Sequence, residues 1–204
     1  MKKHTAIFFA ICVAAFMCRA DEKDDTHKIL SRTIDQGIEI LKNKESSDEQ
    51  KLESYDKLLT ENCHTELMAM LALGKKGWVS FKPDQREQFV SAFLTVMTRS
   101  YYNKLNQVDV SHVSVDYGDN VKTGDTKRIL KTVMKNSGDG FKVDYKFSLR
   151  KGTWAIYDLE VEGISLIASY RSQFTDFLKT KSAAELLVEL EKNSAKFAAE
   201  TVVQ

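Results

Sequence analysis

The chain of 204 residues contains only one proline and three cysteines, and each of these low counts excludes some classes of protein. With one proline there is no proline-rich linker, so the chain is expected to fold without long irregular connections. Cys12 and Cys18 lie near the N-terminus, so Cys63 would lack a disulfide partner once that segment is removed. Cys63 is either a buried structural thiol or a nucleophile beside His64. We favour the first, because adjacent side chains on a helix point about 100° apart.

The sequence also lacks an apolar run long enough to cross a membrane. The longest run, residues 6–17, is shorter than the ~20 residues that a spanning helix needs. It follows a basic start and precedes the small residues Cys18 and Ala20, a pattern typical of a secretory signal peptide. We predict a signal peptide over residues 1–20 with cleavage after Ala20. A retained anchor and a lipoprotein are the weaker alternatives.

Neither sign of charge is in excess. The formal net charge is +1, and removal of Lys2, Lys3 and Arg19 with the signal peptide brings it to about −2. This balance predicts no basic field for nucleic acid or for an anionic membrane surface.

The residue patterns of common enzymes are missing as well. Residues 163–165, Gly-Ile-Ser, resemble the start of a nucleophile elbow, but the second glycine of that motif is absent. There is no glycine-rich phosphate loop. The histidines after the signal peptide do not have metal-ligand spacing; they are His27, His64 and His112. We therefore expect no enzyme, no metal and no cofactor.

Apolar residues recur at helical spacing in the first half of the chain. Ser47 and Gln50 form a capping-box pattern that opens a helix, and Pro83 is tolerated in the first turn of another. Helices are predicted over residues 23–42, from Ser47 onward, over 65–73 up to Gly74, and over 83–105.

Beyond Asn106 the apolar period changes from 3.6 to 2, most clearly from Phe141 to Leu149. Strands are predicted over residues 108–117 with a phase slip near 111–112, over 128–135, over 141–149, and over 153–161 with a phase switch after Ile156. The short connections 136–140 and 151–152 have hairpin chemistry, which indicates an antiparallel meander. Helical periodicity returns over 164–178 and 183–202.

These elements predict one α+β domain over residues 21–204. Its helical part covers about 23–105, its sheet about 106–162 and its C-terminal helices about 163–202. A curved antiparallel sheet of about four strands cannot bury an apolar face alone, so several amphipathic helices must wrap it.

Three stretches resemble the MlaC, or toluene-tolerance, family. They are LGKKGW at 73–78 followed by QREQFVSAF at 85–93, the Val-Asp-Tyr of 143–145, and WAIYDLEVEGISLIASYRSQF at 154–174. Together with the signal peptide and the length, the resemblance covers nearly the whole mature chain. The pair Cys63-His64 departs from the family, which more often carries Asp-Phe there.

The resemblance implies an NTF2-like sheet and a periplasmic, monomeric phospholipid-binding protein. Such a protein carries lipid between an outer-membrane lipoprotein–porin complex and an inner-membrane ABC transporter with an MCE-type subunit, which maintains outer-membrane lipid asymmetry. Phospholipid would then be cargo. A non-lipid interaction module stays open as an alternative. NTF2-like isomerases use a carboxylate in an apolar pocket, but Asp144 and Tyr145 alternate to opposite strand faces, which argues against that function.

The apolar stripes of the helices and strands supply candidate lipid contacts. By pattern alone they favour a filled core, whereas the resemblance favours a slot for acyl chains. The candidate lipid-binding residues are Phe93, Met97, Tyr101, Val133, Val143, Tyr145, Phe147, Ile164, Ile167, Tyr170, Arg171 and Phe174.

Arg171 shares a helical face with Ile167 and Phe174, where an unpaired charge is costly. Two interpretations follow. Its guanidinium either binds a lipid phosphate at the slot mouth or pairs with a carboxylate, of Asp158 or Glu162.

Overall fold

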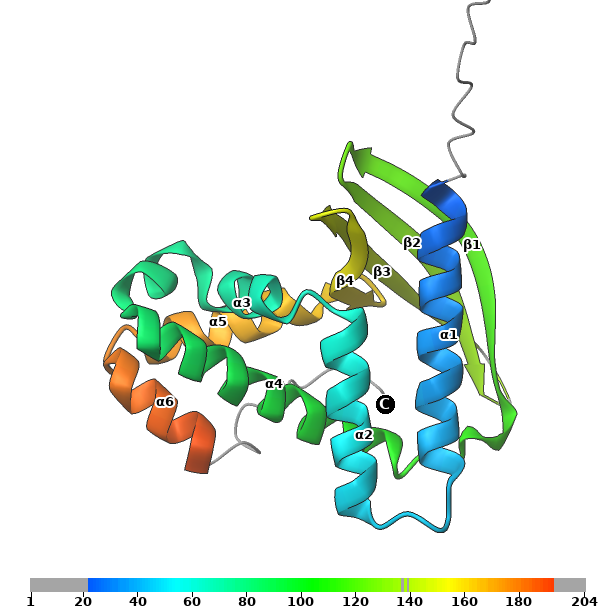
Figure 1. The fold of residues 1–204 in the computed structure, drawn as a ribbon, viewed down its shortest axis with the longest axis horizontal. Coiled ribbons are helices and arrows are strands. Elements are labelled where there is room, and N and C mark those ends of the chain that lie inside the picture. The colour runs from blue at the N-terminus through cyan, green and yellow to red at the C-terminus, as the bar shows by residue number, and fades with distance from the viewer. Residues whose placement is uncertain (1–21, 137, 139, 193–204) are drawn as a thin grey trace, which may run out of the picture.

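The computed structural model describes residues 22–136, 138 and 140–192. Six α-helices are described: α1 (Glu22–Lys42), α2 (Asp48–Asn62), α3 (Thr65–Ser80), α4 (Pro83–Leu105), α5 (Leu166–Phe177) and α6 (Ala183–Lys192). Helices α3 to α6 form a helical half, while α1 and α2 stand beside the sheet (Figure 1). The predicted signal peptide and the end of the last predicted helix, residues 193–202, lie outside the described residues.

The sheet is the predicted antiparallel meander. Its strands, in the order β1-β2-β3-β4-β5, are β1 (Val113–Gly124), β2 (Lys127–Asn136), β3 (Gly140–Arg150), β4 (Thr153–Val161) and β5 (Ile164–Ser165). Two tight turns have positive φ at both central residues, at Lys151–Gly152 and at Glu162–Gly163. Positive φ at both positions is the geometry of a two-residue hairpin turn, and a glycine takes the second position of each.

The first and last strands differ from the prediction. Val110–His112 form a 3-10 turn because the Asp109 carboxylate accepts a hydrogen bond from Ser111 N at 2.9 Å, so β1 begins only at Val113. It then continues to Gly124, through polar residues that show no alternation. The dipeptide Ile164–Ser165, predicted as helix, pairs with β4 instead and makes a fifth strand.

Gly74 interrupts α3 without ending it. Its φ of 70° and ψ of 166° are non-helical, and helical structure resumes to Ser80. The predicted end of a helical stretch at Gly74 is confirmed as a break, but the second stretch up to Ser80 was not predicted. The continuation Lys-Lys-Gly-Trp-Val-Ser is too short to show a helical apolar stripe. The predicted starts of α2 at Ser47 and of α4 at Pro83 are confirmed.

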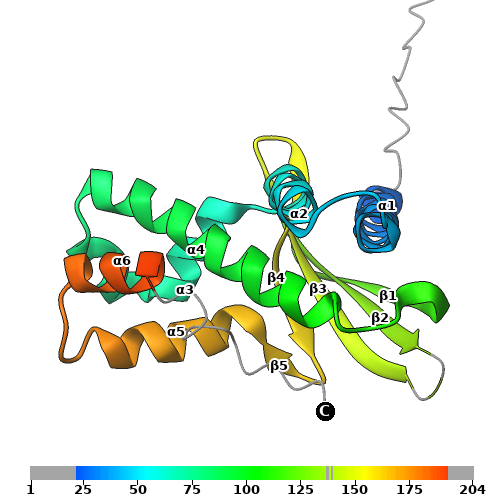
Figure 2. The same ribbon diagram turned by 90° about the horizontal axis from the view of Figure 1, so that it is seen from below.

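The pairing register defines two faces of the sheet. Tyr145 lies opposite Leu130 and Leu159, so these side chains share one face. We call it the inner face, because Leu30 of α1 packs there in a cluster with Phe147. A bulge leaves Tyr157 without a partner on β3, which produces the predicted phase switch after Ile156. Figure 2 shows α1 and α2 on one side of the sheet and α4 running from the helical half toward it.

Buried apolar side chains gather in three clusters within the described residues. The helical cluster joins α3, α4, α5 and α6. The sheet–α1 cluster contains Leu30, Leu130, Phe147, Trp154 and Ile156. The third, smaller cluster joins Tyr55 and Leu58 of α2 to Tyr102 of α4. The core of this protein is thus divided, and the inner face of the sheet contributes Leu130 and Phe147 to only one of the parts.

Candidate functional site

The apolar stripes of α4 and α5 pack against each other. The ring of Phe93 meets those of Tyr170 at 5.0 Å and Phe174 at 5.9 Å, in edge-to-face geometry. Met97 and Ile167 are buried in the same helical cluster, and Tyr101 packs at its side. These six candidate residues come together as predicted, but as a filled core and not as the wall of an open slot.

The candidates on the sheet separate into two sets. Val143, Tyr145 and Phe147 share the inner face, as alternation predicts. Val133 lies opposite Lys142, so it points to the outer face and cannot line the same surface as Val143. Strand β2 carries apolar residues in adjacent pairs, Ile129-Leu130 and Val133-Met134. Its own sequence therefore does not say which member faces inward.

Several apolar side chains of the inner face belong to none of the three clusters, among them Val113 and Val115 of β1 and Ile164 of β5. We call the four of them on β2, β3 and β4 the inner-face patch; it consists of Met134, Phe141, Val143 and Val161. Val143 is 3% exposed and Val161 is 8% exposed, whereas Met134 and Phe141 are only partly buried. The alternation from Phe141 to Leu149 already placed Phe141 and Val143 on one buried face, although Phe141 was not among the candidate lipid contacts. Met134 and Val161 were missed, because strand register decides which face they share.

Tyr145 marks the border between the inner-face patch and the sheet–α1 cluster. Its hydroxyl reaches Met134 Sδ at 3.7 Å, and the ring packs beside the cluster around Phe147. Desolvation by burial raises the pKa of Tyr145 strongly, yet the side chain keeps accessible surface. A side chain that is deeply placed and still accessible is what the wall of an internal space shows.

Asp158 fixes the start of α5. Its carboxylate accepts hydrogen bonds from Ser165 Oγ at 2.7 Å and from Ile167 N at 3.1 Å, and Lys146 Nζ lies 3.0 Å away. Ser165 Oγ in turn caps Ala168 N at 3.0 Å. The Ser165 hydroxyl thus donates to the Asp158 carboxylate and accepts from Ala168 N as the helix cap. This network explains the motif from Trp154 to Phe174 as a folding device.

Arg171 forms no pair with Asp158 or Glu162, so that prediction was wrong. Its Nε donates a hydrogen bond to the Leu71 carbonyl at 2.6 Å, across the interface of α5 with α3. The backbone break at Gly74 lies directly beside this contact, because a Cβ at Gly74 would lie 3.7 Å from Arg171 Cγ. Ile164, another candidate, is 43% exposed at the sheet edge.

Cys63 and His64 lie between α2 and α3 and contact the sheet. His64 N donates to the Ile156 carbonyl at 2.8 Å, and the His64 ring lies 3.0 Å from the Ser148 carbonyl. Cys63 packs against both the helical cluster and the sheet–α1 cluster. Burial raises the pKa of its thiol to about 12, as expected of a structural cysteine.

Residues 22–136, 138 and 140–192 contain neither a cluster of metal ligands nor a membrane-spanning helix. No three His, Cys, Asp or Glu side chains there converge as a metal site would require. None of the helices in this part of the chain combines the length and apolar character needed to cross a bilayer.

A curved antiparallel sheet, partly wrapped by helices and with part of its apolar inner face outside the three clusters, defines an α+β protein. The family model described as the MlaC protein matches residues 31–192. The chain belongs to the MlaC family. None of the curated proteins matches it by sequence.

Among solved structures, the phospholipid-binding protein from Ralstonia solanacearum, in complex with a phospholipid, is similar to this chain. The TM-score is 0.72 at 21% sequence identity, and the alignment covers 85% of this chain and 99% of that one. The likeness shows that the two proteins share a fold.

Proposed function

We propose that this chain binds a phospholipid, with acyl chains against the inner-face patch, and carries it through the periplasm. Membership of the MlaC family and the phospholipid held by the Ralstonia neighbour support this function. The observation that carries it is the inner-face patch, whose apolar side chains pack in none of the three clusters.

The physical need for a carrier follows from the hydrophobic effect. Each methylene moved from an apolar environment into water costs about 0.8 kcal/mol, so an acyl chain of about 16 carbons costs on the order of 10 kcal/mol. A phospholipid with two chains leaves its membrane rarely without help. A protein that offers a dry surface offsets most of this cost and makes exchange fast.

In this role the carrier would deliver lipid between an outer-membrane lipoprotein–porin complex and an inner-membrane MCE-type ABC transporter complex, and so maintain outer-membrane lipid asymmetry. The signal peptide predicted over residues 1–20 supports this location. Cell fractionation and N-terminal sequencing test it: a periplasmic protein that begins at Asp21 is expected. Recovery of unprocessed protein from the cytoplasm would contradict the location and leave lipid binding to be tested separately.

Native mass spectrometry and solvent extraction of the purified protein test the cargo. We expect co-purified phospholipid in wild type and a loss of lipid in Val143→Phe, because the added ring fills the space against the inner-face patch. Val133→Phe makes the same change on the outer face and should keep the lipid. If wild-type protein is purified without lipid and does not bind added lipid, the carrier function is wrong and an interaction module is the better description.

A further inference from the structure

A second apolar surface lies on the helical half, away from the inner-face patch. It is a groove of about 440 Å³ between α3 and α5, lined by Met70, Leu71, Gly74, Lys75, Trp78, Val79 and Arg171. Val79 beside it is 65% exposed, the highest value among the large apolar side chains of the described residues. Nothing in the proposed cargo function uses this groove.

The groove lies at the backbone break at Gly74, and the cation held beside it is Arg171. Gly74 has no side chain, and a Cβ there would lie 3.7 Å from Arg171 Cγ. The Nε of Arg171 is held by the Leu71 carbonyl, and a guanidinium has further N–H groups beyond this bond. Arg171 is therefore placed to offer donors at the groove edge.

The surrounding segment carries a local excess of positive charge that the near-neutral composition conceals. Residues 74–86 contain four basic side chains, those of Lys75, Lys76, Lys82 and Arg86, and one acidic side chain, that of Asp84. Among the described residues, Lys75 and Lys76 have no carboxylate within ion-pair distance. Arg86 lies over the Trp78 ring, 5.4 Å from its centroid, and donates to the Trp78 carbonyl at 2.8 Å. Cations, the exposed Val79 and the partly buried Trp78 thus share one corner.

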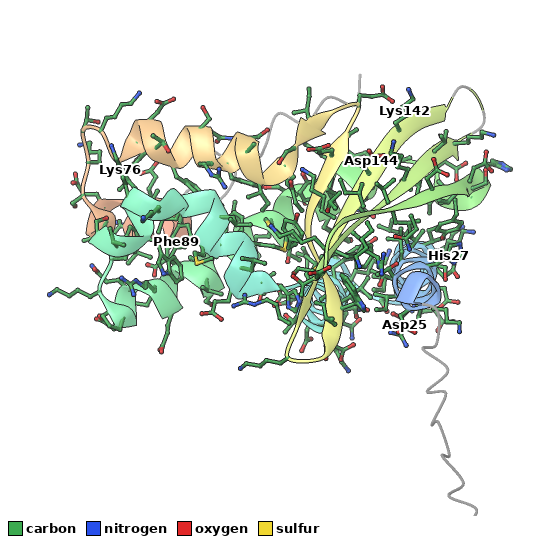
Figure 3. The ribbon with its side chains drawn as sticks, turned by 90° about the horizontal axis from the view of Figure 1, so that it is seen from above. Asp25, His27, Lys76, Phe89, Lys142 and Asp144 are labelled. Atoms are coloured by element: carbon green, nitrogen blue, oxygen red, sulfur yellow. The ribbon has the colours of Figure 1, made fainter. Side chains whose placement is uncertain are left out.

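This corner lies at the end of the molecule away from the sheet. Figure 3 shows Lys76 in the helical half, with Lys142 and Asp144 on the sheet and Asp25 and His27 on α1 toward the other end. Figure 1 shows the helical half at one end of the molecule and α1 with β1 and β2 at the other.

We propose that the groove corner docks on the surface of a bilayer that contains anionic lipids. Trp78 and Val79 enter the interface, where tryptophan partitions favourably, and Lys75, Lys76 and Arg171 meet the phosphates. Charge complementarity and the adjacent tryptophan favour a bilayer over an acidic protein, which would need no inserted apolar group. The charge balance of the whole chain predicted no such field, because a net charge averages over the surface.

Co-sedimentation of the purified full chain with sucrose-loaded vesicles tests the proposal. We expect binding to phosphatidylcholine vesicles that contain phosphatidylglycerol, none to phosphatidylcholine alone, and loss of binding at high salt. Val79→Glu should abolish binding, and Lys76→Gln should weaken it roughly fivefold. The matched controls are Val188→Glu, 46% exposed on α6, and Lys57→Gln, exposed on α2, which should bind as wild type does.

Two outcomes would contradict the docking proposal. The first is that wild-type protein stays in the supernatant with phosphatidylglycerol vesicles. If that protein binds soluble polyglutamate instead, the groove corner binds an acidic protein and not a bilayer. The other is Val79→Glu protein that binds like wild type.

Lipid extraction of the same variants separates this proposal from the cargo function. Folded Val79→Glu should keep its co-purified phospholipid, whereas Val143→Phe should lose lipid and still sediment with vesicles. If folded Val79→Glu loses its cargo instead, the groove is the cargo site and the docking proposal is wrong.

Discussion

At the residue scale, the buried carboxylate of Asp158 is the side chain whose loss should cost most. It is 5% exposed and holds Lys146, Ser165 and the backbone of Ile167 together. Removing one member of a buried charged network leaves the other groups unsatisfied. The carboxylate therefore acts on folding, by fixing where α5 begins.

We expect Asp158→Ala to lower the free energy of unfolding by about 3 kcal/mol in urea titrations. Asp116→Ala is the control, because Asp116 pairs with Lys135 at an exposed site and should change stability by less than about 0.5 kcal/mol. If the two substitutions lower the free energy of unfolding equally, Asp158 does not have this structural role.

The thiol of Cys63 should be nearly inert in the folded protein. Burial raises its pKa to about 12, so the thiolate population at pH 8 falls by about a thousandfold relative to a free thiol. Labelling with a thiol reagent should therefore be slow in buffer and fast in urea. If Cys63 is labelled in buffer at the rate of a free thiol, it is a reactive cysteine and not a structural one.

The same shift gives a pH dependence of stability. The pKa of Cys63 is higher in the folded chain than in the unfolded chain, so the stability linked to the neutral thiol is complete below about pH 9. It should be lost as the pH rises from about 9 toward 12. Cys63→Ala should flatten that part of the stability curve, and an unchanged curve would contradict the assignment.

At the scale of elements, the break in α3 is built on a backbone geometry that suits glycine. With φ of 70° and ψ of 166°, Gly74 lies in a region that other residues reach only at a cost of about 1–3 kcal/mol. Gly74→Ala should lower stability by that amount and disturb the bond from Arg171 to Leu71. Gly124→Ala, with no positive φ and its nearest atom at 4.0 Å, is the control. Equal stability of the two variants would show that the break tolerates a side chain.

At the scale of the whole molecule, the divided core links stability to cargo. If a phospholipid fills the space at the inner-face patch, it binds only the folded chain and stabilises it by mass action. Delipidation should then lower Tm by about 5–10 °C, because a ligand at 100 times its Kd contributes about 2.7 kcal/mol. Val143→Phe should show no such difference, and a Tm of wild type that is indifferent to lipid would count against the cargo.

The division of the core also decides which substitutions test lipid binding. Ile167 is 3% exposed in the helical cluster, so a charge there would unfold α5 whether or not lipid binds. Val143 is as buried as Ile167 but belongs to none of the three clusters, so Val143→Phe adds an apolar ring at the sheet without placing a charge in the core.

The sequence by itself determined the helix starts at Ser47 and Pro83, the strand alternation from Phe141 to Leu149 and the hairpin turn at Lys151–Gly152. These are local, because capping chemistry, period and turn geometry act within a few residues. Family membership also followed from local motifs, and the match over residues 31–192 confirms it.

Tertiary structure alone decided which apolar residues stand outside the cores. Strand register placed Met134 on the inner face and Val133 on the outer one, although they are neighbours. Beside the break at Gly74, Arg171 has a backbone partner 100 residues away in place of a carboxylate on β4. The first outcome depends on the pairing of β2 with β3 and the second on a contact between distant segments, and a period in one segment carries no information about its partner.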